Sequence, residues 1–259
     1  MLEPPRETFF SEVGRPVVAR SADYPDGHTV RPHHHDRHQL LYGSTGVVTV
    51  STAQGAWVMP PQRGMWIPAG VTHSVRMVGA VRTNSLYFEP AAIEGMPDHC
   101  QVVGVSPFMR SLLAEAVRLP REYDLDGREG ALMVLIQHEI RELPHLPLSL
   151  PFPRREDLAR RCHAFLRRPD VHETIDHWSR ALSMNRRTFT RLFRRETGMP
   201  FVTWRQQASL VIALPRLAAG ETVTSVAMGL GYDNPAAFTA MFQRALGASP
   251  RFYLREAQG

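Results

Sequence analysis

The sequence predicts an α+β protein in which an all-β barrel precedes linker helices and an all-α C-terminal domain. Three observations in its 259 residues support this class. Short segments rich in Val, Trp, Tyr and Phe recur between residues 46 and 90, separated by turn signals. Apolar residues take up helical spacing from about residue 106 onward. Four prolines lie within residues 144–153 and indicate a boundary between domains.

The expected strands cover residues 46–52, 56–59, 64–70, 73–78 and 83–90, and the first expected helices cover 106–119 and 128–143. The apolar stripe of the second helix either forms a homodimer or packs on the barrel, and it contains Leu132, Leu135, Ile136, Glu139, Ile140 and Leu143. The expected domains are a barrel with an N-terminal arm at 1–95, a helical linker or dimerisation region at 96–143, a proline-rich linker at 144–153 and a last domain at 154–259.

The composition is that of a globular protein, with 43% hydrophobic and 21% charged residues. We expect no membrane span, because no apolar run is long enough, and no signal peptide in the polar N-terminal stretch. Two cysteines, Cys100 and Cys162, are too few for a disulfide framework or a cysteine zinc site. These features favour the cytoplasm.

Charge is uneven along the chain, and every basic side chain is an arginine. Residues 1–153 hold 13 Arg against 16 Asp and Glu, a net charge of −3. Residues 154–259 hold 17 Arg against 9 Asp and Glu, a net charge of +8. The basic part is either a module that binds a polyanion or a solvated basic surface.

Two successive helix pairs are expected in the basic domain. Thr174 can cap a helix to about Leu182, and Asn185 can cap a second helix that ends at Gly198. This short-helix pair with a tight turn matches a helix-turn-helix. Residues 222–250 repeat the plan, with Asn234 or Asp233 as the cap before Pro235.

The second helix of the first pair has one apolar and one basic face. Its apolar stripe is Phe189, Leu192 and Phe193, whereas Arg187, Thr190, Arg191 and Arg194 follow at i, i+3, i+4 and i+7. Arginine can bond guanine bidentately in the major groove, which favours DNA recognition. The alternative is a surface helix whose arginines pair with solvent or with Glu196.

RTFTRLFRRETGMPFVTWRQQ and VAMGLGYDNPAAFTAMFQRALGASPRFY resemble the DNA-binding domain of the AraC/XylS family of transcription regulators. The resemblance implies two helix-turn-helix units, each with a recognition helix in the major groove, about 34 Å apart. It places the DNA contacts at Arg186, Arg187, Thr190, Arg191, Arg194, Arg195, Asn234, Ala236, Thr239 and Gln243. Of these, Arg187, Thr190 and Arg191 are expected to read bases, and Arg194 and Arg195 to contact phosphates.

The sequence departs from that family pattern at four positions. Ala240 and Ser209 stand where the family often has a basic residue. Pro215 is expected to bend or end the helix that joins the two units. Ser183 stands where glycine is common, and a left-handed serine there would cost up to about 1 kcal/mol relative to glycine.

The first part resembles a cupin, a double-stranded β-helix barrel. The first cupin motif is matched at Gly27, His33, His35, Gln39 and Gly46, with Gln39 in place of the usual glutamate. The second motif is matched at Pro68, Gly70 and His73, with Met77 in place of the usual asparagine. The resemblance implies a site built from His33, His35, Gln39 and His73.

On a strand, residues i and i+2 share a face, so we expect His33 and His35 to point into the barrel and His34 to point out. With His73 they could hold a divalent metal. The alternatives are an organic-effector pocket or a packed barrel without a ligand. His28, His34 and His38 are expected at the surface or at the mouth of the barrel. Tyr42, Trp57 and Trp66 are expected either to line a pocket or to belong to the core.

The expected function is a transcription regulator that binds double-stranded DNA as a homodimer and responds to a small molecule or metal in the cupin domain. The segment PPQRGMWIPAG resembles a subgroup that includes repressors of efflux genes, which favours repression. The alternative is a cupin metalloenzyme, dioxygenase- or isomerase-like, with a basic helical appendage. Gln39 in place of glutamate disfavours the enzyme, and the sequence leaves the effector and the target site open.

Overall fold

The computed structural model describes residues 14–251, which form two compact units. The first unit contains residues 14–52 and Met59–Leu146, and the second contains Ala53–Val58 and residues 147–251. Most of the N-terminal segment, where we expect an arm and no signal peptide, lies outside the described residues. No helix in the described range is long and apolar enough to cross a lipid bilayer.

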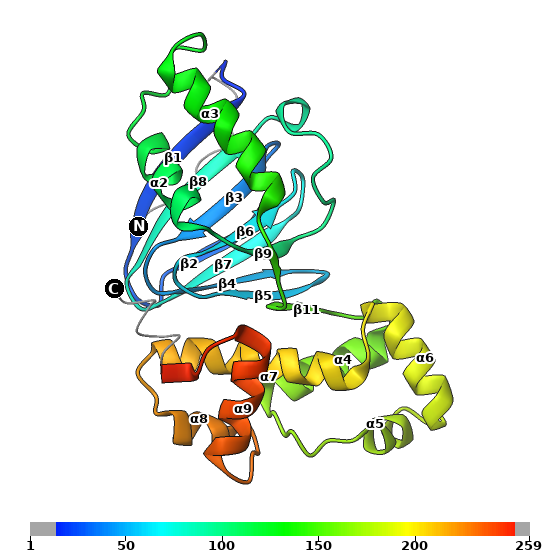
Figure 1. Cartoon of the computed structure of the whole chain (residues 1–259). Helices are drawn as coiled ribbons and strands as arrows, with labels where there is room; N and C mark the ends of the chain where they lie inside the picture. The colour runs from blue at the N-terminus through cyan, green and yellow to red at the C-terminus, as the bar shows by residue number, and fades with distance from the viewer. Residues whose placement is uncertain (1–13, 252–259) are drawn as a thin grey trace. The chain divides into compact units, whose positions relative to one another are not determined.

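The first part of the chain folds into two antiparallel sheets, which confirms the predicted all-β class (Figure 1). The sheet orders are β1-β8-β3-β6-β9-β10 and β11-β5-β4-β7-β2. β9 extends the first sheet beyond residue 95, where we expected the barrel to end. The strands are β1 Val17–Tyr24, β2 Thr29–His33, β3 His38–Gly43, β4 Val47–Thr52, β5 Gly55–Met59, β6 Arg63–Ile67, β7 His73–Val78, β8 Val81–Phe88, β9 Gln101–Gly104, β10 His145–Leu146 and β11 Ser149–Pro151.

The first sheet is covered on both faces, which explains why β3 is buried along almost its whole length. Successive strand residues point to opposite faces. Gln39 and Leu41 line a cavity between the sheets, whereas Leu40 and Tyr42 pack into the apolar core beneath the following helices. The sheet therefore separates the cavity that Gln39 lines from the apolar core beneath the helices.

Helices α2 Pro107–Ala116 and α3 Arg128–Glu139, with the 3-10 turn Ile140–Glu142, form that second layer over the sheet. The predicted stripe of α3 is wrong in part, because Met133, Ile136 and Ile140 are buried while Leu135 is exposed. Gly130 lies on the buried face near the start of α3, where a Cβ would lie 1.9 Å from the Leu125 carbonyl oxygen. Only a glycine permits this close approach of backbone to backbone.

From Glu156 onward the second unit is helical, as predicted, and the first half of this helical part packs around a cluster of aromatic rings. Trp178 lies at the centre, with ring centroids 4.8 Å from Phe201 and 5.9 Å from Trp204. Phe189 and Phe193 contribute the inner face of the following helix. The helices are α4 Glu156–Arg167, α5 Ile175–Ala181, α6 Arg186–Thr197, α7 Phe201–Ala218, α8 Val223–Gly229 and α9 Pro235–Leu246.

Two of the four positions at which the sequence departs from the family pattern lie in α7. Pro215 does not end the helix, which continues to Ala218. The proline removes one helical hydrogen bond, and it lies only three residues before the end, where few further bonds depend on it. Ser209 is fully buried, and its hydroxyl donates to the Arg205 carbonyl at 3.1 Å. It therefore has no surface to offer to DNA.

Candidate functional site

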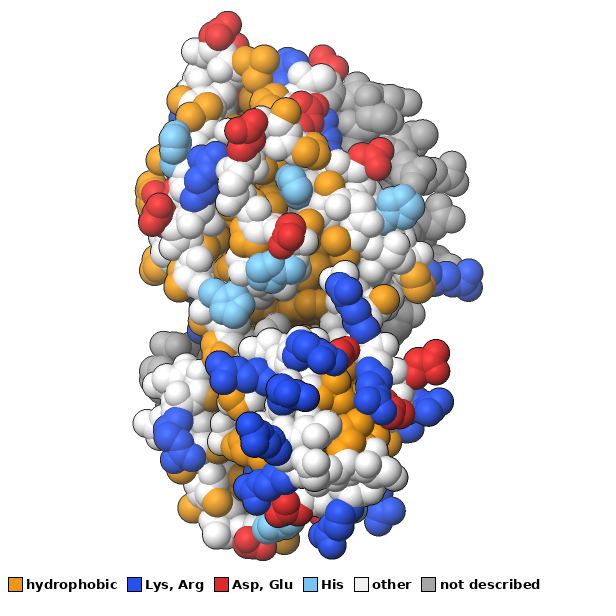
Figure 2. Space-filling view, turned by 90° about the vertical axis from the view of Figure 1, so that its right-hand side faces the viewer, with side chains coloured by type: hydrophobic (Ala, Val, Ile, Leu, Met, Phe, Trp, Pro, Cys, Tyr) orange, Lys and Arg blue, Asp and Glu red, His pale blue; other side chains and the backbone are white. Residues whose placement is uncertain are grey.

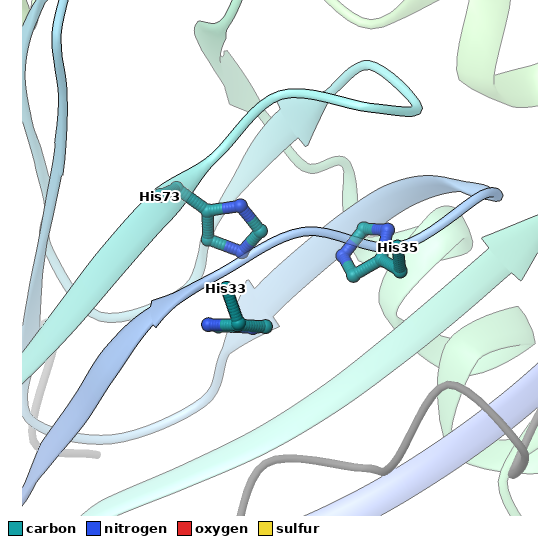
Figure 3. Close-up of side chains that lie close together, drawn as sticks. All are labelled: His33, His35 and His73. Carbon is teal, nitrogen blue, oxygen red and sulfur yellow. The ribbon is translucent and has the colours of Figure 1, made fainter.

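Three histidines come together inside the first unit (Figure 3). His33 ends β2 and pairs directly with His73 at the start of β7. Their ring centroids are 4.3 Å apart, and the His35 ring is 5.3 Å from that of His73. One nitrogen of each ring lies within 4.8 Å of the others, so the three side chains that the sequence grouped do form one cluster.

The route that brings His35 into the cluster differs from the predicted one. β2 ends at His33, and the register with β7 shifts between Val30 and His33. His35 therefore follows the strand rather than lying on it. Its backbone is held instead by Gly70, whose N–H donates to the His35 carbonyl at 2.9 Å. His34 is exposed, as expected.

Each of the three rings is oriented by a backbone carbonyl. The Nδ1 atoms of His33, His35 and His73 donate to the carbonyls of Arg31 at 2.9 Å, Arg37 at 2.6 Å and Val71 at 2.8 Å. A carbonyl oxygen can only accept, so each Nδ1 carries the hydrogen. In a neutral ring the lone pair is then on Nε2, which is the state that a metal or a hydrogen-bond donor requires.

Burial keeps the inner rings neutral. His35 and His73 are 5% and 2% exposed. Loss of solvent lowers the pKa of both rings, that of His73 to about 4. Both imidazoles are therefore uncharged at neutral pH, and the lone pair of each ring is on Nε2.

Gln39 links the cluster to the neighbouring strand β8. Its amide lies 3.0 Å from His35 Nε2, 3.2 Å from Ser85 Oγ and 3.0 Å from the Tyr87 hydroxyl. Since His35 Nε2 is an acceptor in the neutral ring, the Gln39 amide nitrogen faces it and the amide oxygen accepts from the two hydroxyls. Gln39 therefore lies beside the histidines as a neutral, fully bonded group.

The cluster faces a cavity of about 40 Å³. Residues that line it include His33, His73 and Gln39, together with Arg20 from β1, and no carboxylate of the described residues is among them. Arg20 was missed from the sequence, although alternation along β1 with Ala22 and Tyr24 could have indicated it. Tyr42, Trp57 and Trp66 are buried but lie outside this lining.

The second candidate site is the outer face of α6. Asn185 caps this helix by accepting from the Thr188 N–H at 2.8 Å, and left-handed Gly198 ends it, as predicted. Every basic side chain on it is exposed, and Figure 2 shows arginines gathered over the helical unit. Within residues 14–251 no ion pair or hydrogen bond engages the side chains of Arg187, Arg191 and Arg194.

The other predicted contacts on α6 are already engaged within the protein. Arg186 pairs with Asp176 at 3.3 Å, and Arg195 pairs with Glu196 at 3.4 Å. The Thr190 hydroxyl donates to the Arg186 carbonyl at 2.9 Å. The side chains of both ion pairs are solvent-exposed apart from that of Glu196, so these two arginines can exchange their partners for contacts with a ligand.

The outer face of α9 is chemically poorer. Asn234, and not Asp233, caps this helix by accepting from the Ala237 N–H at 2.9 Å. Ala236 and Gln243 are exposed, and Thr239 is half-buried. Arg244 is exposed in the last turn and was missed from the sequence, although it follows Ala240 by one helical turn.

Family models match both parts of the chain. Residues 15–168 match the model described as an AraC-like ligand binding domain, and residues 178–256 match a helix-turn-helix domain. The HTH-type transcriptional regulator NimR of Escherichia coli K12 is 31% identical over 222 residues, which are 86% of this chain and 81% of that protein.

Two solved structures illustrate the similarity. Vibrio cholerae ToxT with bound unsaturated fatty acid is 10% identical, with 94% of this chain and 96% of that chain covered and a TM-score of 0.38. The DNA-binding domain of the global transcriptional factor AdpA, in complex with a target DNA, is 29% identical. It covers 39% of this chain and 96% of its own, with a TM-score of 0.36.

Proposed function

The chain belongs to the AraC/XylS family of transcription regulators, and from that premise we propose that it reads specific DNA sequences under the control of an effector in its barrel. One observation carries the proposal. α6 buries its aromatic face in the helical core and exposes Arg187, Arg191 and Arg194 without partners among the described residues. A helix of this kind suits the major groove.

In this proposal the two recognition helices differ in their contacts. On α6, Arg187, Thr190 and Arg191 read base edges, and Arg194 and Arg195 contact phosphates. Arg186 is the first residue of α6, and we propose that it contacts the backbone of the duplex. On α9, the contacts come from Asn234, Ala236, Thr239 and Gln243.

The DNA-binding proposal is tested by selecting preferred duplexes from a random library and measuring affinity by fluorescence anisotropy at fixed salt. We expect the selected duplex to bind at least 1000-fold more tightly than a scrambled one, the lower end of specific recognition. Replacing Arg187 and Arg191 together with alanine should remove most of that difference. Equal affinity of the unaltered protein for both duplexes would contradict sequence-specific binding.

We assign the effector site to His33, His35 and His73, beside Gln39. The donor set fits a divalent transition metal, because three imidazoles whose Nδ1–H groups are bonded to carbonyls each place one nitrogen within 4.8 Å of the others. A metal would replace the Gln39 amide as the partner of His35 Nε2. A bound metal would supply a positive charge and an open coordination position for an effector. The competing assignment is an organic effector that uses the same lone pairs as hydrogen-bond acceptors.

Metal content separates these two assignments. Untagged full-length protein is analysed by plasma mass spectrometry beside a variant with His33, His35 and His73 replaced by alanine. Near-stoichiometric metal that is lost in the variant supports the metal site. Absence of metal after reloading would contradict it and would leave the histidines as polar groups of an organic pocket.

We further propose a cytoplasmic homodimer that represses its target genes. The buried face of α3 is used within the unit, but Phe108, Leu125, Val134 and Leu135 on and between α2 and α3 remain exposed. Four exposed large apolar side chains in one helical region suit an interface with a second copy. Light scattering of the full chain and of a Phe108→Glu/Val134→Glu variant tests the dimer, and a monomeric parent would contradict it.

A further inference from the structure

We infer that a cavity between α7 and α9 holds a phosphate group of the DNA backbone that runs between the two recognition helices. This inference rests on the proposed binding of DNA by α6 and α9. The cavity has a volume of about 330 Å³ and lies wholly within the helical unit. Two arginines line it, Arg205 and Arg244, and neither is among the DNA contacts proposed above.

The cavity lies between the two helix-turn-helix units. Its walls come from Val171 and His172 before α5, from Arg205 in α7, and from Tyr232 in the turn between α8 and α9. The Val171 N–H donates to the Leu230 carbonyl at 3.1 Å, which joins the first of these walls to the last. With α6 and α9 in successive major grooves, the minor groove between them and its two phosphate strands cross this part of the surface.

The cavity also borders the outer face of α9. Ala237 and Arg244 line it, and they lie one helical turn before and one turn after the exposed Ala240. Arg244 is itself exposed, and its guanidinium has no hydrogen-bond or ion-pair partner among residues 14–251. A duplex that approaches Ala240 would therefore bring its backbone within reach of a free guanidinium, which can bond two phosphate oxygens at once.

Arg205 reaches the same cavity from α7. It is half-buried, and its Nη1 donates to the Glu173 carbonyl, which holds the side chain in place. Burial raises the pKa of Tyr232, and the charges of Arg205 and Arg244 oppose that rise, so both guanidinium groups act on one uncharged phenol of the cavity wall. Two cations that converge in this way suit an anion with several acceptor oxygens, as a phosphate diester has.

The nearby carboxylates do not cancel both arginines. Asp233 is the one acid among the described residues of the lining, and its side chain is 82% exposed and lies 3.4 Å from His172 Nε2. Asp170 and Glu173 act on Arg205 from outside the lining. Asp170 accepts from the His172 N–H at 2.8 Å, and Glu173 pairs with an arginine of α4 at 3.4 Å. The lining therefore holds two arginines against one aspartate.

The test uses the full-length protein and the duplex selected from the random library. Single phosphates of the backbone between the two half-sites are replaced by neutral methylphosphonates, and phosphates outside both half-sites are replaced as a control. Affinity is measured by fluorescence anisotropy for the parent, for Arg205→Gln and for Arg244→Gln. The control variant is Arg160→Gln, an exposed arginine on α4 outside the lining.

We expect one central replacement to weaken binding of the parent and of Arg160→Gln about tenfold, because a charge-assisted contact is lost. The same replacement should weaken binding of Arg244→Gln and Arg205→Gln by less than about twofold, because each has already lost that contact. Each of these two variants should also reduce the salt slope by about 0.9. Arg244→Gln decides the test if Arg205→Gln, which loses its bond to the Glu173 carbonyl, does not fold.

Two results would overturn the inference. Equal losses from every central replacement in the parent and in Arg244→Gln, with the preference for the selected duplex intact, would overturn it and leave the proposed DNA binding standing. A parent that binds selected and scrambled duplexes equally would overturn both the proposed function and this inference.

Discussion

The two helix-turn-helix units have nearly the same backbone and very different outer surfaces. In each unit an equivalent hydrogen bond closes the turn after the first helix. The Met184 N–H donates to the Ser179 carbonyl in the first unit, and the Tyr232 N–H donates to the Ala227 carbonyl in the second. In each, an asparagine caps the second helix and a left-handed glycine ends it. Yet α6 exposes a row of arginines, whereas α9 exposes mainly alanine and glutamine, with one arginine in its last turn.

This difference shows that the fold of each second helix and the chemistry of its outer face are specified by separate residues. Caps, a left-handed turn residue and the inward aromatic side chains set the helix in place. The outward-facing residues do not position the helix, so they can differ between the two units. The two units therefore allow substitutions that change binding without changing folding, and the reverse.

The largest expected change in DNA affinity comes from a substitution on α6. Arg191→Ala should weaken binding to the preferred duplex by about 1–3 kcal/mol and relax the preference at one base pair, if Arg191 reads a base. The matched control is Arg195→Ala, which should weaken all sequences alike and reduce the salt slope by about 1. Anisotropy at several salt concentrations measures both. Equal losses on preferred and scrambled DNA would place Arg191 on a phosphate.

Substitutions at the left-handed residue of each turn should change the stability of the fold and leave the outer faces of the helices unaltered. Gly231 has a φ of 83°, and a Cβ there would lie 2.9 Å from Asp170 Oδ1. Gly231→Ala should therefore lower the free energy of unfolding by about 1–2 kcal/mol, measured by urea denaturation. The equivalent Ser183 is also left-handed, with a φ of 53°, so Ser183→Gly should raise it by up to about 1 kcal/mol. Changes of the same sign in both variants would contradict the equivalence of the two turns.

Adding a charge to α9 should make the two surfaces more alike. Ala240 is exposed on the outer face, where an arginine would lie one turn from Arg244. Ala240→Arg should tighten DNA binding by on the order of 1 kcal/mol and steepen the salt slope by about 0.9. Ala240→Gln, of similar reach but neutral, serves as the control. An unchanged salt slope would mean that α9 does not approach the duplex at this position.

The smallest expected effect concerns methyl contacts. Ala236, Ala240 and the Thr239 methyl group offer apolar atoms of the kind that contact thymine methyls. Replacing thymine by deoxyuracil in the half-site bound by α9 should weaken binding by up to about 0.8 kcal/mol per methyl group removed. The same replacement in flanking DNA is the control. No loss within the half-site would leave α9 with contacts to the DNA backbone only.

Much of the helical unit was predictable because its signals are local. Thr174, Asn185 and Gly198 act within one turn of their own helix, and the structure places each as expected. The barrel site was predictable only as a set of residues. The register shift before His33 and the entry of Arg20 from β1 depend on pairing between distant strands. The face that α3 buries likewise depends on its packing against distant strands of the first sheet, which no periodicity within the helix reveals.

If α6 reads base edges as proposed, the bond between the Thr190 hydroxyl and the Arg186 carbonyl limits which bases Thr190 can contact. With its only hydrogen engaged, this hydroxyl offers lone pairs alone. It then complements the exocyclic amino group of adenine or cytosine, whereas the neighbouring arginines complement the acceptor pair of guanine. One turn of α6 would thus favour a mixed step, with guanine beside an amino-bearing base, over a run of guanines on one strand.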